Sequence, residues 1–128
     1  MSAQVIPYII YRDVPAALDW LAHAFGFTET MRTGTPRGGM HGEMTIDGQL
    51  MMMGQESAER RMQSVSDAKV ATQGVFIYLD NVDAHYERAR ASGARIDKAP
   101  EELPHGRSYA ARDLEGHPWF FTTPPTAR

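Results

Sequence analysis

The sequence predicts an α+β domain built from two copies of one unit, in which a strand and a helix are followed by three strands. The main evidence is a recurrence at an offset of 68 positions, which relates Ile9 to Ile77 and Gly48 to Gly116. A helix cap, a helix and a hairpin turn recur in the same order at this offset. Because a whole supersecondary pattern is repeated, the recurrence indicates a duplicated structural unit.

The first unit is expected to cover residues 4–54. An apolar, β-branched run over residues 5–11 indicates its first strand. Asp13 is suited to cap the following helix, Pro15 fits the first turn of that helix, and Gly26 ends it. The three further strands of this unit are expected over residues 27–33, 39–46 and 49–53.

The second unit is expected to cover residues 73–123 and to repeat this order. Residues 75–79 indicate its first strand, and Asn81 is the expected cap of a helix over residues 82–92. Its shorter strands are expected over residues 95–98, 107–113 and 118–123. Between the units, residues 55–72 are polar without a clear period, so we expect a linker or lid that is mobile without a ligand.

Composition narrows the class of protein. The 128 residues are 42% hydrophobic and 23% charged, which is typical of one folded domain over residues 1–128. The net charge of −3 and the scattered basic residues argue against nucleic-acid binding. No apolar run is long enough to span a membrane, and no signal-peptide pattern is present. The chain has no cysteine, which excludes disulfides and fits a cytoplasmic protein.

Three segments resemble the vicinal oxygen chelate superfamily, which includes glyoxalases, bleomycin-binding resistance proteins and extradiol dioxygenases. They are DVPAALDWL leading to FGF over residues 13–27, VDAH leading to ASGA over residues 82–94, and DLEGHPWF over residues 113–120. In that family each unit forms a curved sheet, two units enclose a cavity, and many members are dimers. The resemblance therefore implies this fold and a homodimer.

The resemblance also locates the positions that hold a divalent metal in enzymes of the family. They lie on the first and fourth strands of each unit and correspond here to Ile6, Met52, Gly74 and Phe120. Ile, Gly and Phe offer no side-chain ligand, and a lone thioether does not hold Mg²⁺, Ni²⁺ or Zn²⁺. We therefore expect no metal and no other cofactor.

Strand alternation then predicts which residues line the cavity. If the four metal positions face it, Tyr8, Phe76 and Tyr78 do so as well. The Asp47-Gly48 turn would place Glu43 opposite Met52. His41 lies on the same strand face as Glu43, and the 68-residue offset maps His41 onto Tyr109 and Gly39 onto Arg107. His41, Glu43, Arg107 and Tyr109 are therefore expected near the rim of the cavity. The expected ligand-binding residues are Tyr8, His41, Glu43, Met52, Phe76, Tyr78, Arg107, Tyr109 and Phe120.

Three other histidines, His23, His85 and His117, are not predicted to be catalytic. His23 and His85 lie among charged helix neighbours and are expected to be exposed to solvent. His117 lies in a turn and is expected to act as a structural hydrogen-bonding residue.

The leading interpretation is a metal-independent protein that binds a partly aromatic small molecule, resembling the drug-sequestering, antibiotic-resistance side of the family. Aromatic residues in the pocket would stack on such a ligand. Three alternatives stay open. His41 and Glu43 could act as general acid and base in a glyoxalase-like or lyase-like enzyme. A family-type metal enzyme could carry its ligands at other positions. The chain could also be a scaffold or regulatory domain without a ligand.

Overall fold

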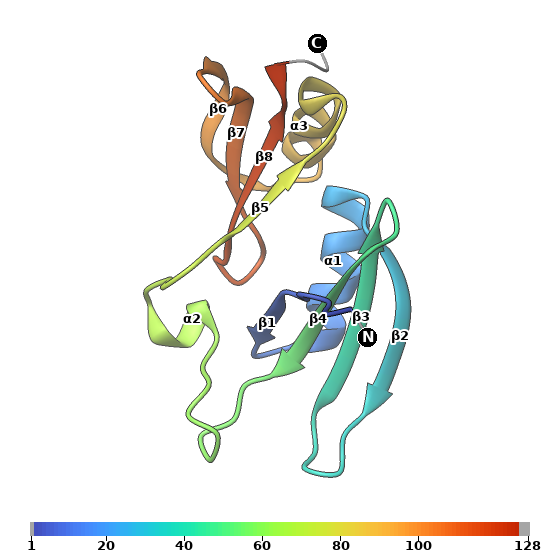
Figure 1. Cartoon of the computed structure of the whole chain (residues 1–128). Coiled ribbons are helices and arrows are strands. Elements are labelled where there is room, and N and C mark those ends of the chain that lie inside the picture. Colours follow the sequence, from blue (N-terminus) through green and yellow to red (C-terminus); the bar gives the residue numbers. More distant parts are fainter. Residues whose placement is uncertain (1, 126–128) are drawn as a thin grey trace.

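Two four-stranded mixed sheets, each associated with one long helix, form the chain (Figure 1). The computed structural model describes residues 2–125. The strand order is β1-β4-β3-β2 in the first sheet and β5-β8-β7-β6 in the second. In both sheets the first strand pairs parallel with the last, and the other pairs are antiparallel. The predicted fold class, a duplicated βαβββ unit, is therefore confirmed.

The strands of the first half are β1 (Tyr8–Tyr11), β2 (Thr28–Gly34), β3 (Met40–Ile46) and β4 (Gln49–Gln55). Those of the second half are β5 (Val75–Tyr78), β6 (Arg95–Leu103), β7 (Gly106–Arg112) and β8 (Pro118–Thr123). β6 extends well beyond the predicted 95–98. Its own sequence has little alternation, and its pairing with β7 is interrupted by two register shifts, so its length is set by the partner strand.

Both long helices begin at the predicted caps, and the first also ends at the predicted glycine. In α1 (Val14–Phe25), the Asp13 carboxylate accepts a hydrogen bond from the Ala16 amide at 3.1 Å. In α3 (Val82–Ala91), the Asn81 side-chain oxygen accepts one from the Ala84 amide at 3.1 Å. Each bond satisfies an amide that has no partner within its own helix. Gly26 ends α1 with a φ of 75°, a left-handed conformation that glycine adopts without strain.

One apolar core joins the two halves. α1 and α3 lie side by side where the halves meet (Figure 1). Phe25 at the end of α1 packs its ring 4.9 Å from Phe121 and 5.7 Å from Trp119, both on β8. The helix-facing side of each sheet is therefore buried in a shared core. The opposite side of each sheet, which we call its outer face, points away from the helices.

A buried carboxylate ties the last hairpin to the first half. Asp113 accepts hydrogen bonds from the Tyr11 hydroxyl at 2.5 Å and from the Trp119 indole at 3.0 Å. Its neighbour Glu115 accepts from the backbone amides of Arg12 at 2.8 Å and Asp13 at 2.9 Å. The β7–β8 turn thus holds the start of α1 through side chains from the second half.

The segment between the halves contains more structure than its polarity predicts. A short helix, α2 (Val65–Ala68), begins at Ser64, which is fully buried. Before it, Ser57 and Met62 pair through two backbone hydrogen bonds of 2.9 Å, closing a tight turn that we call the 57–62 turn. Only this turn resembles the expected lid.

Candidate functional site

The outer face of the first sheet brings together four of the predicted residues. Met52 is paired in register with Tyr8 on one side and Glu43 on the other, as predicted from the Asp47-Gly48 turn. The His41 ring nitrogen Nε2 lies 3.0 Å from Glu43 Oε2. These two side chains are only 25% and 18% exposed, so the pair is partly shielded from water.

Gly54 allows the Tyr8 ring to lie against the sheet. A Cβ atom at this position would overlap the Tyr8 ring and its hydroxyl group. The Tyr8 side chain consequently extends along β4 toward the 57–62 turn, where its hydroxyl lies 3.3 Å from an Arg60 guanidinium nitrogen. The sequence analysis did not identify this role of Gly54, because a glycine at the end of a strand also suits an ordinary turn.

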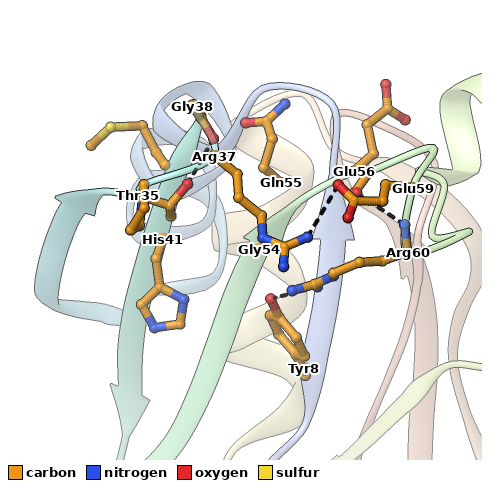
Figure 2. A pocket seen from close by; sticks show the side chains of 14 residues that line it. Tyr8, Thr35, Arg37, Gly38, His41, Gly54, Gln55, Glu56, Glu59 and Arg60 are labelled. Atoms are coloured by element: carbon orange, nitrogen blue, oxygen red, sulfur yellow. Dashed lines mark hydrogen bonds and ion pairs between the residues drawn. The ribbon is translucent and has the colours of Figure 1, made fainter.

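A pocket of about 630 Å³ lies at this end of the face (Figure 2). Its walls come from the β2–β3 connection, the end of β4 and the start of the segment after it. Tyr8 and His41 are the predicted residues that line it. The charged lining residues Arg37, Glu56, Glu59 and Arg60 were not predicted. They lie on irregular segments, where neither alternation nor the 68-residue offset indicates which side chains converge.

The outer face of the second sheet carries an aromatic cluster, formed by Phe76, Tyr78 and Phe120. The Phe76 ring lies 5.3 Å from Tyr78 and 6.5 Å from Phe120, the latter nearly parallel at 21°. These side chains are 48%, 59% and 39% exposed, unusually high for large aromatic residues within a sheet. Gly74 leaves room for the Phe120 ring, since a Cβ there would lie 2.7 Å from it.

Arg107 and Tyr109, which were expected at the rim of the cavity, lie on the helix-facing side of the second sheet. Tyr109 is 1% exposed and packs among core aromatics, and the Arg107 guanidinium pairs with Asp83 of α3 at 3.0 Å. Both side chains face the helix, because Phe120 is paired with Ala110 and not with a residue one position away. The expectation that Arg107 and Tyr109 lie at the rim was therefore wrong.

The hairpin turns explain this error. Ile46 pairs with Gln49, which leaves two residues in the first turn. In the second hairpin the Asp113 amide donates to the His117 carbonyl at 3.1 Å, which leaves three residues between them. Met52 and Phe120, on the strands after the turns, correspond at an offset of 68, whereas Glu43 and Ala110, on the strands before them, correspond at an offset of 67. A shift of one residue moves every side chain of a strand to the other face.

His85 is also placed differently from the expectation. Its ring is partly buried, with Nε2 2.9 Å from the Phe25 carbonyl and Nδ1 2.6 Å from the Tyr109 hydroxyl. Since a carbonyl only accepts, Nε2 carries the proton, and Nδ1 of the neutral ring accepts from Tyr109. Burial lowers the pKa of His85, assisted by the positive charge of Arg88. The prediction that His85 is exposed was wrong.

His117 is 7% exposed, and its Nδ1 has no hydrogen-bond partner among the described residues. Its backbone amide donates to the Asp113 carboxylate at 3.0 Å. The structural role predicted for His117 is thus carried by its backbone, and its ring packs edge-on against Trp119.

The predicted lining residues are divided between two separate faces. The pocket on the first half is lined by none of the three residues of the aromatic cluster. The cluster itself stays open to solvent. Within one chain, the polar face of the first sheet and the aromatic face of the second therefore do not line a common cavity.

Comparison with known proteins identifies the family. Residues 4–121 match the Glyoxalase/Bleomycin resistance protein/Dioxygenase superfamily. The chain belongs to this superfamily. No curated protein matches the sequence.

Solved structures of the superfamily share the fold over nearly the whole chain. TioX from Micromonospora sp. ML1 is 29% identical, with 94% of this chain and 95% of TioX covered at a TM-score of 0.74. TnmS3, an antibiotic binding protein from Streptomyces sp. CB03234, is 17% identical, with coverages of 97% and 98% and a TM-score of 0.74. The fosfomycin resistance protein FosX from Listeria monocytogenes is 16% identical, with coverages of 98% and 94% and a TM-score of 0.70. The last two comparisons support the fold alone.

The metal positions of the superfamily do not fit a divalent ion in this chain. Met52 lies between Tyr8 and Glu43, and Phe120 lies between Phe76 and Ala110. A thioether and a phenyl ring cannot replace carboxylate or imidazole ligands. Across residues 2–125, His, Asp and Glu side chains nowhere gather in a group of three or more that could hold a metal. In the same range, no helix is long and apolar enough to cross a membrane.

Proposed function

We propose that the protein binds a small molecule with a planar aromatic part, and that it holds this molecule without a metal and without turnover. The observation that carries the proposal is the exposed aromatic cluster of Phe76, Tyr78 and Phe120. Stacking a ligand ring on this cluster would remove apolar surface from water and add favourable aromatic contacts. The antibiotic binding described for TnmS3 and the fosfomycin resistance of FosX support an antibiotic as this ligand.

We further propose that the working form is a homodimer. The aromatic cluster is exposed to solvent, the polar face with His41 and Glu43 is partly exposed, and the two lie on different sheets of one chain. Large apolar groups exposed within a sheet commonly mark an interface or a ligand site. A second copy could place its first-sheet face against the aromatic cluster and so enclose a ligand between two chains. Symmetry would then create two equivalent sites.

The binding proposal is tested by a thermal-shift panel of planar aromatic antibiotics, measured with and without EDTA and followed by calorimetry on any hit. Phe76→Ala and Phe120→Ala should each make the binding free energy of this ligand about 1–3 kcal/mol less favourable, because each removes an aromatic ring that contacts the ligand. Glu43→Gln should weaken binding by about 1 kcal/mol or less, and EDTA should leave affinity unchanged. Loss of binding in EDTA, or equal affinity in all variants, would contradict the proposal.

A second candidate function rests on the His41–Glu43 pair. A contact of 3.0 Å between an imidazole and a carboxylate is within reach for proton transfer, and His41 lines the pocket. An enzyme would consume the hit, and Glu43→Gln would stop that consumption while leaving affinity nearly intact. Product analysis in the same panel therefore separates an enzyme from a binding protein.

A further inference from the structure

We propose that Arg37 and Arg60 form a clamp for an oxyanionic group of the ligand, such as a carboxylate, phosphate or sulfonate. This inference rests on the proposed function, because it specifies the chemistry at one end of the bound molecule. The clamp lies in the pocket of about 630 Å³ at the end of the first sheet. Figure 2 shows the two guanidinium groups pointing toward each other across this pocket, near the Tyr8 hydroxyl.

Arg60 supplies a cation that is not engaged in an ion pair among residues 2–125. One of its guanidinium nitrogens lies 3.3 Å from the Tyr8 hydroxyl and 3.1 Å from the Met62 sulfur. Both groups are neutral, and no carboxylate of residues 2–125 forms an ion pair with Arg60. A guanidinium has five N–H donors in a planar fork, which matches the two oxygens of a carboxylate or phosphate. Arg60 therefore retains donors for an incoming anion.

Arg37 supplies a second cation, whose existing ion pair is weak enough for a ligand anion to replace it. Among residues 2–125 its ion-pair partner is Glu59 at 3.3 Å, and these two side chains are 62% and 79% exposed. Ion pairs this exposed contribute little free energy because water and salt screen them. A ligand oxyanion between Arg37 and Arg60 would face two guanidinium groups, and Glu59 could turn into solvent.

The remaining groups of the pocket are compatible with an anion. Glu56 lines it, but one of its oxygens accepts a hydrogen bond from the Ser64 amide at 3.0 Å. The Tyr8 hydroxyl accepts from Arg60, so its own proton is available for the ligand. His41 lies on the opposite wall, with its ring 6.4 Å from that of Tyr8. Two carboxylates thus share the pocket, one held by a backbone amide and one exposed.

The experiment compares benzoate, its uncharged analogue benzamide, and inorganic phosphate as probes. Binding is followed by NMR through the Nε–Hε signals of Arg37 and Arg60. We expect benzoate to shift both signals and benzamide to shift neither. Arg60→Gln and Arg37→Gln should each weaken benzoate about five- to tenfold, the loss expected for a charge-assisted contact that is partly exposed. Arg90→Gln, on the exposed side of α3 and paired with Glu87, is the matched control and should change nothing.

The phosphate arm identifies the source of the anion. Inorganic phosphate that binds as tightly as benzoate, with the same sensitivity to Arg60→Gln, indicates a site for free anions. Tighter binding of benzoate indicates an anion carried on an aromatic ligand. Equal binding of benzoate and benzamide, or benzoate binding that Arg60→Gln leaves unchanged, overturns the clamp.

Failure of the clamp is distinguishable from failure of the proposed function. Phe76→Ala, on the second sheet, should leave phosphate binding unchanged because its ring lies outside the pocket. If an antibiotic binds through the aromatic cluster without changing the chemical shifts of the two arginine signals, the clamp is wrong and the binding function stands. If benzoate and phosphate both shift the arginine signals but no antibiotic of the panel binds, the clamp stands and the binding function fails.

Discussion

At His85, burial and the hydrogen bond from Tyr109 together oppose protonation of the imidazole ring. It lies on α3 but accepts from Tyr109 of β7 and donates to the last carbonyl of α1, so one ring connects three elements. Its ring centroid is 4.2 Å from that of Phe121 and 5.7 Å from that of Phe25. Protonation would place a positive charge among aromatic side chains and remove the acceptor that Tyr109 uses.

This geometry predicts that stability falls in mild acid. The pKa of His85 is lowered in the folded state from its ordinary 6.5, so below pH 6.5 the unfolded chain binds more protons than the folded chain. The free energy of unfolding is then fully retained above pH 6.5 and decreases as the pH falls toward the folded-state pKa. Urea unfolding between pH 7.5 and 5.5 measures this slope.

His85→Gln should reduce this pH dependence, and His23→Gln, at an exposed position of α1, should not. Part of the slope should remain in His85→Gln, because burial also lowers the pKa of His117. An unchanged slope in His85→Gln would show that its protonation does not affect stability.

At the scale of elements, the β7–β8 turn links the two halves through buried and partly buried hydrogen bonds. Asp113→Asn preserves Oδ1, which accepts from the Glu115 and His117 amides, but replaces Oδ2 by an amino group. That amino group would face the Trp119 indole N–H, which can only donate. We expect a loss of about 2–4 kcal/mol in the free energy of unfolding, because a buried donor is left without an acceptor.

Asp97→Asn is the control for this substitution. Asp97 pairs with Arg112 and Arg95 near the surface, so its loss should cost about 1 kcal/mol or less. Equal destabilisation by the two substitutions in urea unfolding would contradict the role given to Asp113.

The segment between the halves should divide into two parts by amide exchange. Ser64 is buried, its amide donates to Glu56, and Ser66 contacts Glu115 at 3.3 Å, so α2 is anchored to the rest of the chain. Residues 58–61 are exposed, and the turn that contains them is closed by the two backbone hydrogen bonds between Ser57 and Met62 and by one from the Arg61 amide to the Ala58 carbonyl. Hydrogen exchange of the free protein should therefore be fast over residues 58–61 and slower at Lys69, whose amide donates to Val65. Uniform exchange over residues 55–72 would favour the simpler expectation of a wholly mobile lid.

The sequence was informative where local rules act and unreliable where a turn changes the register. Asp13, Asn81 and Gly26 mark helix ends through hydrogen bonds and backbone angles that depend on neighbouring residues alone. The side of the sheet on which Arg107 lies depended on the length of the turn over residues 114–116. The available signal was an offset of 67 residues, which aligns Gly39 with Gly106. Arg37 and Arg60 converge only through tertiary structure, which no pattern in the sequence indicates.

At the scale of the whole molecule, the shared core determines what a single chain can enclose. Phe25 and Phe27 of the first half pack on Trp119 of the second half. The helix-facing surfaces of both sheets are therefore already buried within one chain. The two outer faces then point away from that core, one polar and one aromatic. A binding site that uses both must bring them together from different copies.

This arrangement predicts that two defective variants restore each other. Tyr8→Ala alters the first-sheet face and Phe120→Ala the second-sheet face, so each variant alone should bind an antibiotic found in the panel more weakly than the native protein does. In an equimolar mixture, random pairing gives about half heterodimers, and a two-chain site leaves each heterodimer one intact site. About a quarter of the native binding capacity should therefore return at native affinity, measured by calorimetry after subunit exchange.

Mixing Phe76→Ala with Phe120→Ala is the control and should restore none, because both changes lie in the same half of the site. Absence of recovery in the first mixture, or light scattering that gives the single-chain mass of 14.3 kDa for the ligand-bound protein, would show that one chain binds alone.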